Sequence, residues 1–168
     1  ADTHFGHWGV CKFLRDDGTK LRPWGNPDDM DKALINNWNA VVKNNDRVYL
    51  LGDVVINRKC LPILYHLKGR KVLVKGNHDI FKLKDYEPYF DDIRAYVVGN
   101  THSGQRYIMS HIPIHNGSLA RFDLNIHGHL HSGFVKDRDN NRDKNYMCVS
   151  VENINYTPLD LNTIIKDN

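Results

Sequence analysis

Four short apolar segments of the chain are each closely followed by a side chain that can bind a metal ion. The segments have the length of buried strands, and the side chains that follow them are Asp53, Asn77, His111 and the pair His129 and His131. In open α/β sheets, ligands bind beyond the carboxyl ends of the strands. The regularity therefore predicts one convergent polar site at one edge of the fold.

The order of the expected elements indicates a mixed α/β domain. Apolar residues at helical spacing predict a helix over 28–44 and a second over 57–67. Strands are expected over 47–52, 71–75, 93–98, 106–110, 124–127 and 147–151. The first half therefore alternates strand and helix, and the second half is mostly strands. The polar stretch 136–145 is typical of a solvated loop or hairpin tip.

Size and composition fit a single globular domain. The 168 residues can bury a core, and the 40% hydrophobic and 26% charged fractions are close to average. A net charge of +3 argues against a nucleic-acid-coating protein but allows negatively charged substrates. Three cysteines without C-x-x-C spacing argue against a disulfide framework and favour a reducing compartment. Since neither a membrane-length apolar run nor a signal peptide is visible, we expect a cytoplasmic protein.

Two motifs place carboxylates where a metal ion could use them. In an extended segment, residues two apart point to the same side, so Asp2 and His4 could hold one ion. The same D-x-H pattern is also common in surface loops. Asp53 follows a buried strand, where a carboxylate is costly unless it is paired or bound to metal, and it could bridge two ions. A helix N-cap explains Asp53 equally well.

Two further motifs concentrate histidines. In Gly76-Asn77-His78-Asp79, the Asn77 amide offers a neutral oxygen ligand, and we expect Asp79 to fix the tautomer of His78. A tight turn would explain the Gly, Asn and Asp but not the His. The histidines at 127, 129 and 131 alternate with a spacing typical of metal sites. A packed or pH-sensitive histidine cluster is the alternative for that pattern.

The motifs D-x-H, G-D, G-N-H-D, H and G-H-x-H, in this order, resemble the signature of calcineurin-like metallophosphoesterases. The likeness extends to Arg22-Pro-Trp24, Trp38-Asn39 and the segment 149–158, and is closest to the small, capless bacterial and phage-type members. The resemblance implies one metallophosphoesterase domain over 1–168, folded as a four-layer αββα sandwich of two mixed β-sheets flanked by helices. In that family a strand precedes D-x-H. Only Ala1 precedes Asp2 in this sequence, and if the strand is truly absent we expect Asp2 and His4 to be poorly anchored.

The resemblance also implies a binuclear metal centre and a role for each motif residue. Two divalent ions (Mn, Fe, Zn or Ni, with Mn favoured) are expected. Asp2, His4 and His131 would hold the first, Asn77, His111 and His129 the second, and Asp53 would bridge both. A metal-bridging hydroxide would attack phosphorus in line with the leaving group. His78, oriented by Asp79, would stabilise the developing charge or protonate the leaving oxygen.

Phosphodiester hydrolysis is the favoured function, on a small phosphoester or nucleotide-like substrate. Phosphomonoesterase or protein phosphatase activity is the alternative, although the protein phosphatase signatures G-D-x-x-D-R-G and G-N-H-E are not reproduced at 52–58 and 76–79. A non-catalytic metal-binding scaffold is a third interpretation, and the complete ligand set together with His78 argues against it. A nucleic-acid substrate is compatible with the sequence but not indicated by it. The sequence leaves the natural substrate, the metal and the oligomeric state open.

Overall fold

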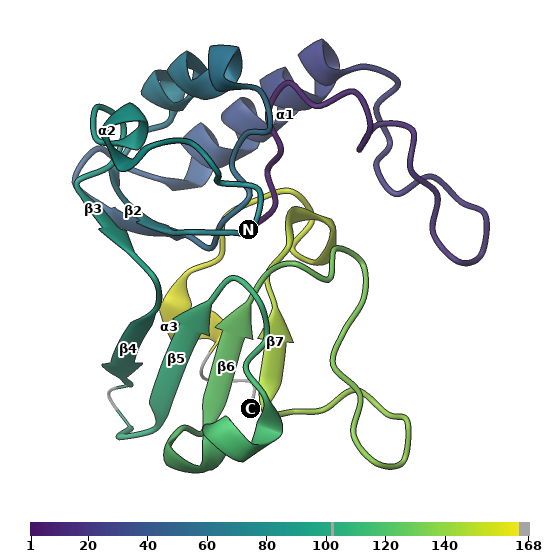
Figure 1. The fold of residues 1–168 in the computed structure, drawn as a ribbon, viewed down its shortest axis with the longest axis vertical. Helices are drawn as coiled ribbons and strands as arrows, with labels where there is room; N and C mark the ends of the chain where they lie inside the picture. Colours follow the sequence, from purple (N-terminus) through teal and green to yellow (C-terminus); the bar gives the residue numbers. More distant parts are fainter. Residues whose placement is uncertain (102, 165–168) are drawn as a thin grey trace.

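The computed structural model describes residues 1–101 and 103–164, and its two β-sheets pack against each other (Figure 1). The three-stranded sheet has the order β1 (Arg47–Leu50), β2 (Arg70–Val74), β3 (Asp92–Arg94). The four-stranded sheet has the order β4 (Val97–Asn100), β5 (Arg106–Ser110), β6 (Leu124–His127), β7 (Tyr146–Cys148). The helical elements are α1 (Pro27–Val41), η1 (Arg58–His66), α2 (Leu83–Tyr86), η2 (Asn116–Arg121), η3 (Val151–Asn153) and α3 (Leu161–Ile164).

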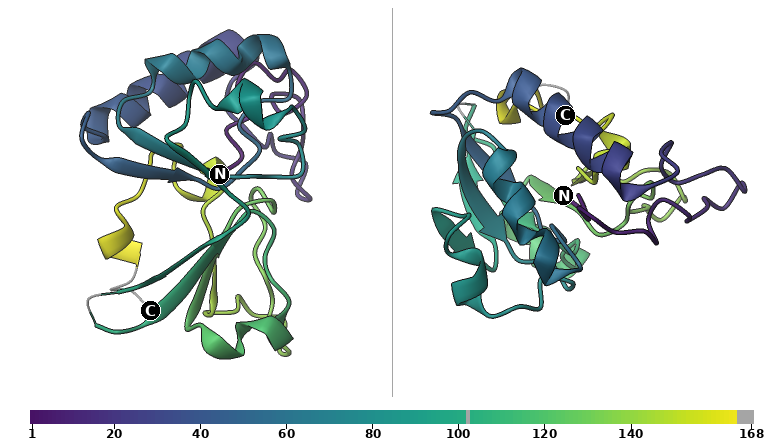
Figure 2. Two further views of the ribbon diagram at one scale, coloured as in Figure 1. Left: turned by 60° about the vertical axis from the view of Figure 1, so that its left-hand side comes forward. Right: turned by 90° about the horizontal axis from the view of Figure 1, so that it is seen from above.

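The layers follow from which faces are apolar. Helix α1 and the 3₁₀ helix η1 lie side by side over the outer face of the three-stranded sheet, where Met30, Leu34 and Leu64 join the main core (Figure 2). The outer face of the four-stranded sheet is covered by η2, whose Leu119 packs with Ile108 of β5. A third apolar cluster lies between the two sheets. The expected αββα arrangement is therefore confirmed, with η2 as the fourth layer.

Local sequence explains both long helical segments. Helix α1 begins where the Asn26 side chain accepts a hydrogen bond from Asp29 N, with Pro27 in its first turn, and it ends at Val41, earlier than the predicted 44. The predicted helix over 57–67 is a 3₁₀ helix over Arg58–His66. Pro62 lies inside it and lacks a backbone N–H, which disfavours a regular α-helix there.

Two expectations about the sheets are corrected. The segment predicted as one strand over 93–98 is two strands, β3 paired parallel with β2 and β4 paired antiparallel with β5. At this point the chain leaves the three-stranded sheet and enters the four-stranded sheet, and an apolar run alone does not reveal such a change. Only the four-stranded sheet is mixed, whereas the pairs β1–β2 and β2–β3 are both parallel. The reason is that η1 and α2 serve as crossovers between those strands.

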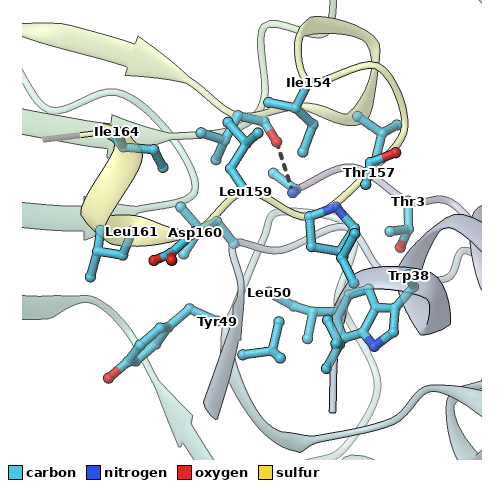
Figure 3. Close-up of a pocket in the computed structure, with 18 of the residues that line it drawn as sticks. Thr3, Trp38, Tyr49, Leu50, Ile154, Thr157, Leu159, Asp160, Leu161 and Ile164 are labelled. Atoms are coloured by element: carbon cyan, nitrogen blue, oxygen red, sulfur yellow. Dashed lines mark hydrogen bonds between the residues drawn. The ribbon is translucent and has the colours of Figure 1, made fainter. Parts of the chain in front are cut away.

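An apolar cavity lies between the sheets. It measures about 560 Å³ and is lined by β1, the end of α1 and the segment from Ile154 to Ile164. In Figure 3 the side chains of Leu50, Trp38 and Leu159 surround it. Its lining contains none of the seven predicted metal ligands. The predicted metal ligands therefore lie outside this cavity.

Two features of the described residues concern membranes and disulfides. None of the helices in 1–101 and 103–164 is long and apolar enough to cross a membrane. Cys11, Cys60 and Cys148 are all free thiols.

Candidate metal centre

The carboxyl ends of β1, β2, β5 and β6 bring the predicted ligands together from both sheets. Within the four-stranded sheet, Gly128 N donates to His111 O at 2.9 Å, which places the two loops after β5 and β6 side by side. Between the sheets, the ring of His111 reaches the Leu51 carbonyl at the end of β1, with Nδ1 and the oxygen 2.8 Å apart. The predicted convergence of strand-end side chains is therefore present.

Asn77, His111 and His129 form one group, called here the amide cluster. The Asn77 Oδ1 atom lies 2.9 Å from His111 Nε2 and 3.0 Å from His129 Nδ1. Because the Leu51 carbonyl can only accept, His111 Nδ1 carries a proton. A second proton on Nε2 would make the ring a cation that donates to Asp53, whereas in the neutral ring Nε2 presents a lone pair to the oxygens of Asn77 and Asp53. Lone pairs that meet in this way repel unless a proton or a cation lies among them. The donor set therefore fits a metal ion.

Asp2, His4 and His131 form a second group, called here the buried cluster. One potential ligand atom from each lies within 4.8 Å of the others. Asp2 Oδ2 accepts hydrogen bonds from His129 N at 2.9 Å and Ser150 Oγ at 2.7 Å. Asp2 Oδ1 and His4 Nδ1 are buried with no hydrogen-bond partner among the described residues. A buried, unpaired carboxylate oxygen is costly, and a bound cation would compensate it.

Asp53 stands between the two clusters. Its Oδ1 atom accepts a hydrogen bond from His78 N at 2.8 Å. Its Oδ2 atom lies 3.3 Å from His111 Nε2 and 4.0 Å from His4 Nε2, and so faces both clusters. Burial alone would raise the pKa of Asp53, but hydrogen bonds from His111 and from the His78 backbone lower it. The result is an ionised carboxylate that lies between the two clusters.

Five of the seven predicted ligands have a backbone conformation that side-chain-bearing residues rarely adopt. Their φ angles are 57° at Asp2, 48° at His4, 56° at Asp53, 71° at His129 and 49° at His131. Such conformations cost of order 1–3 kcal/mol each and gather at functional sites. The explanation from an extended D-x-H segment is thus wrong. Left-handed backbone, and not strand alternation, turns Asp2 and His4 toward one point.

Comparison with known proteins identifies relatives along almost the whole chain. No family model matches it. The chain is 34% identical to the uncharacterized protein MJ1445 of Methanocaldococcus jannaschii, over 99% of this chain and 87% of that protein. It belongs to the MJ1445 family. It is also 27% identical to the Gene 66 protein of Mycobacterium phage D29, over 81% of this chain and 78% of that protein.

Solved structures add a close and a distant neighbour of this MJ1445-family chain. The protein of unknown function AQ665 from Aquifex aeolicus is 29% identical and superposes with a TM-score of 0.67, over 99% of this chain and 96% of that one. A novel archaeal phosphodiesterase is 16% identical with a TM-score of 0.47, over 70% and 73% of the two chains. The second likeness is too weak to carry an argument about function.

The start of this MJ1445-family chain is firmly held. Asp2 N donates to Gly52 O at 3.0 Å and His4 N donates to Asp53 O at 3.1 Å. On the other side, Ala1 N donates to Val149 O at 3.0 Å. The expectation that Asp2 and His4 would be poorly anchored is therefore wrong. Hydrogen bonds to both neighbouring segments hold this backbone in place.

The two residues predicted to take part in catalysis have different surroundings. His78 is exposed, and its ring lies edge-on to that of His4 with centroids 5.9 Å apart. Asp79 is buried and accepts three backbone hydrogen bonds, from Asp53 N at 2.8 Å, Val54 N at 3.1 Å and Gly76 N at 2.8 Å. The predicted orientation of His78 by Asp79 is thus corrected. Asp79 clamps the loops after β1 and β2 together, because three N–H groups already occupy its carboxylate.

Protonation in the buried cluster is set by burial and by one neighbouring ion pair. Burial, together with the positive charge of Arg22, lowers the pKa of His4 to about 3, so this ring is neutral and keeps a lone pair for a metal ion. Burial would also lower the pKa of His131, but a hydrogen bond to Glu152 raises it. Arg22 and Glu152 themselves were not assigned a role from sequence. A buried ion pair formed across 130 residues leaves no local sequence signal.

Proposed function

We propose that this chain is a binuclear metal-dependent phosphoesterase that hydrolyses phosphodiesters. The observation that carries the proposal is the place of Asp53, whose Oδ2 atom faces His4 of the buried cluster and His111 of the amide cluster. A shared carboxylate between two groups of ligands is the arrangement that a pair of metal ions needs.

The donor set defines which metals the site would accept. Asp2, His4 and His131 would hold the first ion, Asn77, His111 and His129 the second, with Asp53 shared between them. Mixed oxygen and imidazole donors suit Mn, Fe, Zn or Ni, and we favour Mn. When bound, such a pair supplies Lewis acidity toward the phosphate and lowers the pKa of a coordinated water.

Two residues of the chain have roles besides metal binding: His78 would donate a proton, and Asp79 holds the loop that carries His78. His78 is exposed at the edge of the clusters and is held through its backbone N–H by Asp53. From there its ring can donate a hydrogen bond to a phosphate oxygen or a proton to the leaving oxygen. Asp79 keeps this loop at a constant distance from Asp53 by binding the backbone of both loops.

The openness of the site favours a diester of small size. Asn77 and His78 are both exposed, so a phosphate bearing two substituents can reach the clusters from solvent. We propose a small phosphoester or nucleotide-like substrate, in keeping with the net charge of +3. We also propose a cytoplasmic location, in keeping with the three free cysteines.

The test is a metal-supplemented ester screen. The protein is stripped of metal with a chelator and assayed with bis-p-nitrophenyl phosphate and p-nitrophenyl phosphate, with and without added Mn²⁺. We expect Mn²⁺-dependent hydrolysis, faster for the diester, that is lost again in excess chelator. Metal binding without hydrolysis of any phosphoester would refute the proposal and support a binding scaffold.

A variant of His78 separates catalysis from metal binding. His78→Ala should lower turnover by roughly 10²–10⁴-fold, the usual contribution of a proton donor, while the number of bound ions stays at the wild-type value. His66→Ala, an exposed histidine on η1, is the matched control and should be silent. A His78→Ala protein with wild-type turnover would remove His78 from the mechanism.

A further inference from the structure

Arg22 is fully buried, yet its guanidinium group is occupied on every side. Nε donates to Glu152 Oε1 at 2.9 Å, Nη1 donates to the Thr3 carbonyl at 2.8 Å, and Nη2 donates to the Asp2 carbonyl. The planar fork of an arginine is suited to such simultaneous contacts. Arg22 therefore ties the backbone of the first ligand, Asp2, to a carboxylate 130 residues further along the chain.

Glu152 connects the same arginine to a second ligand. Its side chain is completely buried, and its Oε1 atom also lies 3.1 Å from His131 Nδ1. A carboxylate that is ionised can only accept, so His131 Nδ1 carries the proton of this bond. The remaining nitrogen, Nε2, is then the atom that is free to join Asp2 and His4 in the buried cluster.

Stability alone does not account for this buried pair. An arginine–glutamate pair removed from water can lose more free energy of hydration than its attraction returns, and its replacement by apolar residues of similar size is often neutral or stabilising. Glu152 Oε2 has no hydrogen-bond partner among the described residues, which adds to the cost. The contacts that the pair does make go to the backbone of Asp2 and Thr3 and to the ring of His131.

We infer that Arg22 and Glu152 are positioning residues that build the buried cluster, Arg22 by fixing the backbone of Asp2 and Thr3, Glu152 by fixing the tautomer and orientation of His131. The inference rests on the proposed function in so far as the buried cluster binds a metal ion. Among the described residues the pair makes no direct hydrogen bond to the amide cluster, whose His111 is oriented by the Leu51 carbonyl and whose link to Asp2 runs only through the His129 backbone N–H. Loss of the pair should therefore weaken one metal site and spare the other.

Metal titration of the full chain tests this asymmetry. Metal-free protein is titrated with Co²⁺, the bound ions are counted by mass spectrometry after dialysis, and the Co²⁺ absorption spectrum reports the ligand field of each site. For Glu152→Gln we expect the affinity of the tighter site to fall roughly 10–100-fold, as for other partners of ligating histidines, with the weaker site unchanged. Arg22→Lys keeps the positive charge but loses the planar guanidinium group, so the Co²⁺ spectrum of this variant should also differ from that of wild type.

Two more variants separate positioning from folding. In the double variant Arg22→Met, Glu152→Gln, neither charge is left buried without its partner, and the same loss at one site is expected. Leu64→Ala removes an equally buried side chain on the outer face of the three-stranded sheet and should lower stability while keeping both ions. Wild-type Co²⁺ affinity in Glu152→Gln, or an equal loss in Leu64→Ala, would overturn the inference.

The outcome also distinguishes this inference from the proposed function. If Glu152→Gln loses one ion but wild-type protein hydrolyses no ester, the positioning role stands and the phosphoesterase proposal fails. If wild-type protein hydrolyses esters and Glu152→Gln binds both ions normally, the reverse holds. If wild-type protein binds no Co²⁺ or Mn²⁺, both fail.

Discussion

The buried cluster and the amide cluster both gather side chains that can bind metal, but they differ in their exposure to water. In the buried cluster, Asp2 and His4 are shielded from water, and each has a polar atom with no hydrogen-bond partner within the part of the chain that the structure describes. In the amide cluster, Asn77 is exposed and its oxygen is already approached by both imidazoles. The polar atoms of the buried cluster lost their hydration during folding. The free energy of binding a cation is therefore more favourable there than in the amide cluster. We therefore expect a tightly held ion in the buried cluster and an exchangeable ion, close to the substrate, in the amide cluster.

Removing the charge that the clusters share should have the largest effect. Asp53→Asn keeps the hydrogen bond from His78 N but loses the charge between His4 and His111. Because a metal pair supplies several kcal/mol of charge stabilisation, diesterase activity should fall by at least about 10³-fold. The measurement is kcat at saturating Mn²⁺. Asp92→Asn, in an exposed ion pair with Arg94, is the control. Activity within tenfold of wild type would mean that Asp53 does not couple the clusters.

Removing one ligand from each cluster tests whether they differ in affinity. Asn77→Ala should leave one ion bound after dialysis and raise the Mn²⁺ concentration for half-maximal activity by about tenfold or more, since an open site is weakened. His4→Ala should instead lose the ion that survives dialysis in wild type, because the buried ligand set is broken. Metal counting by mass spectrometry decides between them. The opposite pattern would reverse the assignment of tight and exchangeable sites.

The smallest effect concerns the loop that follows the buried cluster. Both oxygens of Asp31 on α1 accept from Gly6 N, at 3.1 and 3.0 Å, and burial raises the pKa of Asp31 from 3.8 to about 6. A carboxyl whose folded pKa is raised stabilises the fold below the unfolded pKa, and this contribution is lost as pH rises through the folded value. Asp31→Asn should therefore become more stable relative to wild type between pH 4 and 7.

Urea unfolding at a series of pH values measures this change. After allowance for solvent screening of the half-exposed carboxyl, the gain should be about 1 kcal/mol. A stability difference that does not change with pH would show that Asp31 titrates normally. The same variant should leave the number of bound ions unchanged, because Asp31 contacts the loop and not a ligand.

Much of the fold was accessible from sequence because it is encoded locally. The apolar spacing of Met30, Leu34 and Trp38 predicts α1, and apolar runs ending in Gly or a polar residue predict most strands. The sequence does not predict the division of 93–98 between two sheets. Hydrophobic periodicity indicates that a residue is buried, but it does not indicate with which strand the segment pairs. The same limit applies to η1, where the helical pattern does not separate a 3₁₀ from an α-helix.

The sequence by itself determined the chemistry of the site: which donor atoms are available and that most of them follow strands. Only the tertiary structure decided how they meet. Asp2 and His4 converge through left-handed backbone, Asp79 clamps two loops instead of orienting His78, and Arg22 with Glu152 holds the buried cluster. Residue types and short spacings carry chemical information along the chain, whereas the contact of Asp79 with Val54 spans 25 residues and that of Arg22 with Glu152 spans 130. Their geometry exists only once the sheets have packed.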